Sequence, residues 1–92
     1  MKDKVLVKII VPEIDQEFDA YIPIAKKVGN IINLVNEYIS TKIDSDYKLS
    51  KSNKMYNAMT REQYHSDVLV ANTNIRNGTR LVIISNLNVA KQ

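Results

Sequence analysis

The stretch Val68–Ser85 constrains the fold more than any other part of the chain. It contains a short apolar run at 68–70, a polar turn at 72–74, the apolar residue Ile75, an Asn77-Gly78 turn and the apolar run Leu81–Ile84. Asn-Gly favours a turn because glycine adopts positive φ at low steric cost, and the β-branched run after it is typical of a buried strand. We therefore predict a central strand over 81–84 that pairs with the early apolar run Val5–Val11.

Two strands are predicted at the start of the chain. Residues 4–11, KVLVKIIV, place Val5, Val7, Ile9 and Val11 on one face and Leu6, Lys8 and Ile10 on the other. Pro12 ends this strand and the acidic stretch Glu13–Glu17 forms the connection. Apolar and polar residues then alternate over 18–24, which indicates a half-buried second strand in a hairpin with the first. Pro23 places that strand at an edge of the sheet.

One amphipathic helix is predicted from about Lys26 to Ser40. Its apolar face is expected to carry Val28, Ile31, Ile32, Val35, Tyr38 and Ile39, and its polar face Asn30, Asn33, Asn36 and Glu37. Gly29 indicates either close packing or a helix that begins one or two residues later. Residues 41–54 predict a long loop anchored by Ile43, Tyr47 and Leu49. Residues 55–57 and 63–64 predict two brief strands joined by a turn at 58–62, in a register left open.

The predicted order is strand, strand, helix, short strand, short strand, long final strand. A hairpin followed by one crossover helix covers one face of a mixed sheet, which is the α+β architecture of the ubiquitin-like β-grasp, with four to five strands and one main helix. We expect one domain over residues 4–85 and a short tail over 86–92.

Four segments resemble the YukD/EsaB family of ubiquitin-like proteins, which is associated with bacterial type VII secretion. They are VLVKIIVP in the first strand, FDAYIPI in the hairpin, VGNIINLV in the helix and NIRNGTRL before the last strand. The resemblance implies a cytoplasmic, non-enzymatic adaptor or regulator that binds protein components of a type VII secretion system. It implies no conjugation, because the Gly-Gly that ubiquitin and sulfur carriers use at their C-terminus is absent from the sequence. A protein modifier or sulfur carrier is therefore the least expected function.

Composition excludes several other classes. The chain has no cysteine and one histidine, so we expect no disulfide, metal or cofactor site. It shows no signal peptide or apolar span long enough to cross a membrane, so we expect a cytoplasmic protein without membrane insertion. The net charge of +3 is mild and both signs are mixed, so a nucleic-acid-binding module stays an alternative without being indicated.

No catalytic residues are expected. His65, Ser66 and Asp67 are neighbours in a predicted solvated turn, which does not present the geometry of a triad. Asp44 and Asp46 lack the ligand count and the glycine of a calcium loop. Most of the five tyrosines are interpreted as packing residues and not as stacking platforms for bases; they are Tyr21, Tyr38, Tyr47, Tyr56 and Tyr64.

A protein-binding surface is predicted on the side of the sheet away from the helix. If Leu81 and Ile83 face the helix, Val82 and Ile84 lie on the other side next to the first strand. A face exposed only to water normally alternates apolar and polar residues, and these two strands largely do not. The predicted surface consists of Leu6, Lys8, Ile10, Arg80, Val82 and Ile84. The alternatives are that these aliphatic side chains are ordinary exposed residues shaded by their neighbours, or that the surface mediates self-association.

Overall fold

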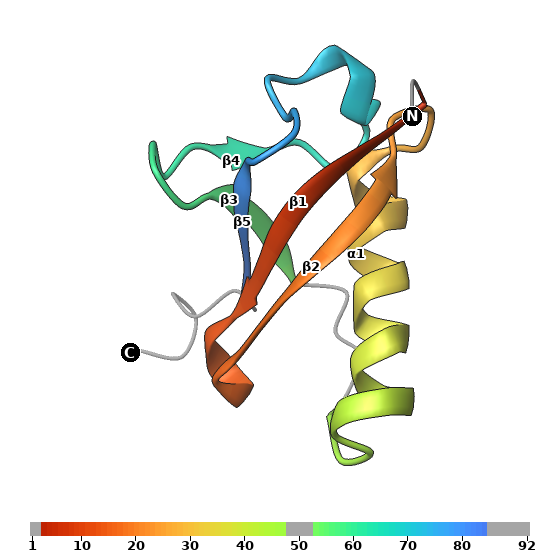
Figure 1. Ribbon diagram of the computed structural model, residues 1–92, viewed down its shortest axis with the longest axis vertical. Helices are drawn as coiled ribbons and strands as arrows, with labels where there is room; N and C mark the ends of the chain where they lie inside the picture. Colours follow the sequence, from red (N-terminus) through yellow and green to blue (C-terminus); the bar gives the residue numbers. More distant parts are fainter. Residues whose placement is uncertain (1–2, 48–52, 85–92) are drawn as a thin grey trace.

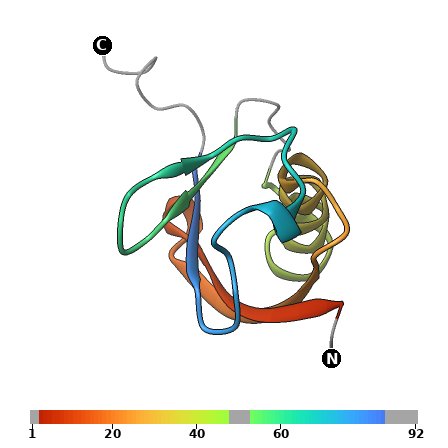
Figure 2. The ribbon, with the colours of Figure 1, turned by 90° about the horizontal axis from the view of Figure 1, so that it is seen from above.

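The structure is a computed structural model that describes residues 3–47 and 53–84. Its strands are β1 (Lys4–Val11), β2 (Gln16–Pro23), β3 (Lys54–Asn57), β4 (Gln63–Tyr64) and β5 (Arg80–Ile84), and its helix is α1 (Val28–Tyr38). The five strands form one sheet in the order β2-β1-β5-β3-β4. The helix α1 lies across one side of this sheet (Figure 1), and Figure 2 shows the sheet curving around it.

The predicted pairing of the two ends of the domain is confirmed. Strand β5 is parallel to β1, with Ile9 opposite Leu81, and antiparallel to β3 on its other side. Strand β1 also forms the predicted antiparallel hairpin with β2, which lies at the edge. With the two short strands in place, this topology is the α+β β-grasp expected from the sequence.

The core lies between α1 and the facing side of the sheet. Every second residue of a strand faces this core, and the residues of α1 that repeat at helical spacing face it from the other side. The buried residues therefore follow the predicted patterns. The buried residues of the sheet, of α1 and of the residue that follows α1 are Val7, Ile9, Val11, Ile22, Val28, Ile31, Ile32, Val35, Ile39, Met55, Tyr64, Leu81 and Ile83. Val70 and Ile75, in the segment that precedes β5, are also buried in this core.

The Asn77-Gly78 turn forms as predicted. Gly78 has a φ of 91°, in the region that glycine adopts without steric cost. Its N–H donates to the Leu6 carbonyl at 2.8 Å, and the Leu6 N–H donates to the Asn77 side-chain oxygen at 2.8 Å. The turn therefore extends the pairing of β1 and β5 and aligns the two strands.

The bounds of β2 and of the helix differ from the predictions. Strand β2 begins at Gln16 instead of Phe18, because a 3-10 turn over Pro12–Ile14 is closed by Asp15, which has a φ of 53°. The helix begins at Val28 instead of Lys26 and continues as a π-helical turn, Ile39–Ile43, into the predicted loop. Leu49 and residues 86–92 lie outside the described residues.

The prediction was wrong for Asn36 and Tyr38, whose places on the helix are exchanged. Asn36 is 1% exposed, because the chain after the helix folds back over it. Its side-chain oxygen accepts hydrogen bonds from the Tyr47 hydroxyl at 3.1 Å and from the Asn53 amide at 2.9 Å. Tyr38 is 46% exposed and lies against the ring of Phe18 in β2, with 5.1 Å between the ring centroids.

Gly29 marks close packing at the start of a helix that also begins two residues later than Lys26. Its N–H donates to the Ser66 carbonyl at 2.9 Å, and a Cβ at this position would lie 3.2 Å from the same oxygen. We expect Gly29→Val to lower the free energy of unfolding by about 1–3 kcal/mol, because its methyl groups push against backbone. Urea denaturation measures this, with the exposed Asn33→Val as the control for β-branching in the helix. An equal loss in both variants would mean that the contact with Ser66 is unimportant.

The hydrogen-bonded cluster of Asn36, Tyr47 and Asn53, in which Tyr47 is partly buried, predicts a pH dependence. Burial raises the pKa of the Tyr47 phenol, the hydrogen bond from Asn53 lowers it, and the charge of Glu13 raises it, with a net upward shift. Stability from a group with a raised folded-state pKa is complete below its unfolded pKa and is lost as the pH rises through the folded value. The stability advantage of the wild type over Tyr47→Phe should therefore shrink above about pH 10. Urea denaturation from pH 8 to 11 tests this, and a constant difference would contradict it.

Candidate protein-docking surface

The side of the sheet opposite α1, here called the open face, carries all six predicted binding residues. The alternation that buries Val7, Ile9, Leu81 and Ile83 leaves the residues between them on this face. Leu6 is 37% exposed, Arg80 is exposed, and the other four are partly exposed. The six residues are Leu6, Lys8, Ile10, Arg80, Val82 and Ile84.

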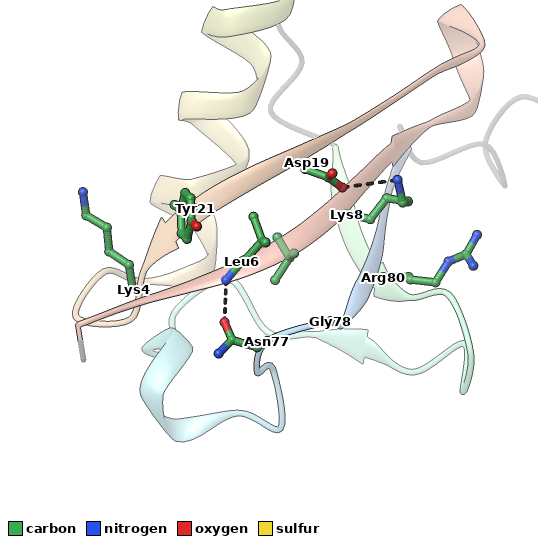
Figure 3. A pocket seen from close by; sticks show the side chains of 9 residues that line it. Lys4, Leu6, Lys8, Asp19, Tyr21, Asn77, Gly78 and Arg80 are labelled. Atoms are coloured by element: carbon green, nitrogen blue, oxygen red, sulfur yellow. Dashed lines mark hydrogen bonds and ion pairs between the residues drawn. The ribbon is translucent and has the colours of Figure 1, made fainter. Parts of the chain in front are cut away.

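The structure divides these six residues into two groups. Leu6, Lys8 and Arg80 line a surface depression of about 450 Å³ over β1, β2 and the start of β5 (Figure 3). The rest of its lining is Lys4, Val7, Asp19, Tyr21 and the turn residues Asn77 and Gly78. Ile10, Val82 and Ile84 lie further along the strands, beyond this depression.

Contacts between β1, β2 and the Asn77-Gly78 turn connect the walls of this depression. The Lys8 ammonium lies 3.2 Å from the Asp19 carboxylate, across the β1–β2 pair. On the other side of β1, the Asn77 side chain points back to the Leu6 N–H, as Figure 3 shows. These interactions preorganise the surface, because its walls belong to paired strands and a closed turn.

An apolar row crosses three strands beside this depression. Ile10 is the register partner of Val82, and Val82 is the register partner of Tyr56 in β3. All three side chains are partly exposed. Tyr56 was absent from the predicted site because its place follows only from the register of β3 on β5. We call Ile10, Val82 and Tyr56 the apolar row.

The charges of the open face are only partly compensated. Lys8 and Arg80 are register partners on neighbouring strands, an arrangement of like charges that is unfavourable by itself. Asp19 offsets the charge of Lys8, whereas Arg80 has no ion pair with any residue in 3–47 or 53–84. Figure 3 shows the Arg80 side chain extending away from the Lys8–Asp19 pair. A cation next to an apolar row suits a partner surface with an apolar centre and an acidic group.

The remaining candidate groups lie in two turn segments, 44–46 and 65–67. Residues 65–67 are exposed, as predicted for a solvated turn, and the Ser66 carbonyl holds the first turn of α1. The Asp44 carboxylate accepts the N–H of Asp46 at 2.9 Å. In the part of the chain that the structure describes, no three His, Cys, Asp or Glu side chains gather as metal ligands would.

The tyrosines belong to separate surroundings. Tyr64 is buried and Tyr47 packs against the core, as interpreted. Tyr21, Tyr38 and Tyr56 reach the surface, so the interpretation as packing residues does not hold for most of the five tyrosines. Tyr21 is 61% exposed at the rim of the depression, and Tyr38 lies on the helix side of the molecule. No helix in the described residues combines the length and the apolarity that a membrane span requires.

No protein-family model matches the chain, and no curated protein matches it in sequence. Among solved structures, a chain from a study of molecular mimicry of SUMO in DNA repair is similar over 89% of this chain and 91% of its own, with 10% identity and a TM-score of 0.71. Ubiquitin of Caldiarchaeum subterraneum is similar over 90% of this chain and 94% of its own, with 13% identity and a TM-score of 0.66. These matches establish the ubiquitin-like fold.

A further match is a chain of the MycP5-free ESX-5 inner membrane complex. The similarity covers 91% of the present chain but only 22% of that chain, with 12% identity and a TM-score of 0.64. The fold of the present chain thus also occurs as part of a larger protein in that complex.

Proposed function

We propose that this chain is a non-enzymatic adaptor or regulator of a bacterial type VII secretion system and acts in the cytoplasm by binding protein components of that system. The observation that carries this proposal is the open face of the five-stranded sheet, where an apolar row lies beside Arg80, which has no ion pair within the described residues. Such a surface has the parts of a docking site, namely an apolar centre and a polar rim. Binding is therefore the activity that we propose.

Two similarities support the type VII assignment. The sequence motifs in the first strand, the hairpin, the helix and the final turn resemble the YukD/EsaB family. The fold is also similar to part of a chain in the ESX-5 inner membrane complex. We infer that the partner is a protein of the secretion machinery, with an acidic residue placed to meet Arg80 and apolar side chains placed to cover Val82.

Arg80→Glu tests the charge of this surface. Reversing an exposed rim charge is expected to slow association with an acidic partner and to leave folding intact. We expect the secretion component to be recovered with the wild-type chain and recovered poorly with Arg80→Glu, in affinity purification from the native host with quantitative mass spectrometry. Arg61→Glu, in the turn between β3 and β4, is the matched control.

The same purification separates the alternatives. Recovery of secretion components by all three proteins would keep the function but place the docking surface elsewhere. Recovery of nucleic acid instead, with affinity that falls steeply as salt is added, would favour the nucleic-acid-binding alternative. An increase in the intact mass of the chain by a covalent adduct would point to a modifier.

A further inference from the structure

The Asn77-Gly78 turn is chemically reactive as well as structural. Asn77 is the only asparagine in the sequence that a glycine follows. In such a pair, the backbone nitrogen of the glycine can attack the side-chain amide of the asparagine and release ammonia. Glycine favours this attack, because it has no Cβ to obstruct the five-membered ring that forms and reaches the required backbone angles at low cost. Both residues are exposed to water in this turn.

Strand β1 holds both reacting groups of this pair. The Gly78 N–H donates to the Leu6 carbonyl at 2.8 Å, so the nitrogen that would attack is bound through its proton. The Asn77 side-chain oxygen accepts the Leu6 N–H at 2.8 Å, which fixes the side chain toward β1 (Figure 3). The backbone of one residue in β1 thus binds the nucleophile and the electrophile at the same time.

These two hydrogen bonds have opposite effects on the reaction. The Leu6 N–H polarises the side-chain carbonyl of Asn77, and a donor at this oxygen stabilises the negative charge that develops there during the attack. The Leu6 carbonyl withholds the proton that the Gly78 nitrogen must lose before it becomes a nucleophile. The second effect dominates, because no attack occurs without a deprotonated nitrogen. The closed turn is therefore protected, and the reaction requires that the turn opens.

We propose that Asn77 is a deamidation site that β1 guards, so that conversion takes place in chains whose contact between β1 and the turn has opened. In the open turn, the Gly78 nitrogen loses its proton and forms a bond to the Asn77 Cγ. The bond between Cγ and the side-chain nitrogen breaks, ammonia leaves with the proton, and a succinimide remains. Water then opens this ring without any other reagent. Attack of water at Cγ gives aspartate, and attack at the backbone carbonyl carbon gives isoaspartate.

The two products have different effects on the sheet. Aspartate keeps the course of the main chain and an oxygen that accepts the Leu6 N–H. Isoaspartate routes the main chain through the side chain of residue 77 and adds one methylene before Gly78, so the two hydrogen bonds to Leu6 no longer fit one register. Leu6, Asn77 and Gly78 line the depression on the open face. Isoaspartate therefore disrupts this part of the depression, whereas aspartate adds a negative charge to it.

The test needs no partner and does not depend on the proposed function. The folded full chain, the full chain unfolded in guanidinium chloride and a capped peptide of residues 74–81 are incubated at the same mildly alkaline pH. Mass spectrometry follows the replacement of the side-chain NH₂ by OH, and peptide mapping locates it. We expect the unfolded chain to convert first at Asn77, at a rate close to that of the peptide. The folded chain should convert at this residue at least about tenfold more slowly.

Hydrogen exchange of the Gly78 amide, followed by NMR, measures the opening of the turn independently. In exchange as in deamidation, this N–H must first leave the Leu6 carbonyl. Relative to the peptide, deamidation of the folded chain should therefore be slowed at least as strongly as the exchange of this amide.

Thr79→Val loosens the turn without changing the reacting pair. The Thr79 hydroxyl accepts the Arg76 N–H at 2.9 Å and so closes the turn from within. Its loss should raise the deamidation rate of the folded chain by about threefold or more and leave the rate of the peptide unchanged. Thr60→Val is the matched control, because it removes a hydroxyl that accepts the Glu62 N–H in the distant turn after β3. This variant should deamidate as slowly as the wild type.

Several results would overturn the proposal. They are equal deamidation rates of Asn77 in the folded and the unfolded chain, first conversion of the unfolded chain at another asparagine, and equal acceleration by the two threonine variants. A folded Thr79→Val chain that exchanges its Gly78 amide faster than the wild type but deamidates no faster would also contradict it, because opening would then not limit the reaction.

Discussion

Replacing Leu81 with alanine is expected to lower the free energy of unfolding by about 2–5 kcal/mol. Leu81 is fully buried in the central strand β5, where its register partners are Ile9 on β1 and Asn57 on β3. Its side chain lies in the same core as α1. The surrounding elements are held from several sides, so the truncated site cannot collapse fully and a cavity remains.

Urea denaturation followed by circular dichroism measures this loss. Val82→Ala is the matched control, because it lies on the same strand but points to the open face and is partly exposed. Its cost should be about 1 kcal/mol or less. Equal losses for the two variants would contradict the assignment of the two faces of β5, on which the docking surface depends.

The second large effect concerns binding. We expect Val82→Asp to weaken the complex with the secretion component by about 30-fold or more, the scale of a central interface residue. The new carboxylate stands in the middle of the apolar row, between Ile10 and Tyr56. Docking would remove this carboxylate from water without giving it a partner. The carboxylate would also repel the acidic group that we propose to meet Arg80.

Titration calorimetry with the purified component measures this change. Met59→Asp carries the same new charge in the exposed turn after β3 and should retain the wild-type affinity. Circular dichroism checks that both variants are folded. An affinity for Val82→Asp within about twofold of the wild type would remove the apolar row from the interface.

The local patterns of the sequence were sufficient to predict the strands and the turn that carry the docking surface. Strand β1 has the predicted bounds, Lys4–Val11, because its alternation is regular and Pro12 ends it. The Asn77-Gly78 turn and the apolar run after it located β5 for similar reasons of backbone preference. The pairing of β5 with β1 followed from topology. A central strand near the end of the domain needs a partner strand, and the comparable apolar run lies at its beginning.

Other features depend on contacts between distant residues, which the sequence pattern does not encode. Asn36 occupies a polar position in the helical period, but Tyr47 and Asn53 cover it and bond its side chain. Tyr38 has the spacing of a core residue, but it faces the edge strand β2 and stays exposed near Phe18. Tyr56 joined the docking surface only through its register with Val82.

In-cell photo-crosslinking tests the central claim most directly. A photoreactive phenylalanine analogue is placed in the native host at Tyr56 on the open face and, in a second strain, at Tyr38 on the helix side. Both positions hold an aromatic ring that reaches the surface, so the replacements are matched. We predict that the analogue at position 56 crosslinks to a component of the type VII secretion machinery and that the analogue at position 38 does not. Crosslinks to that machinery from position 38 alone, or none from either position, would contradict the account.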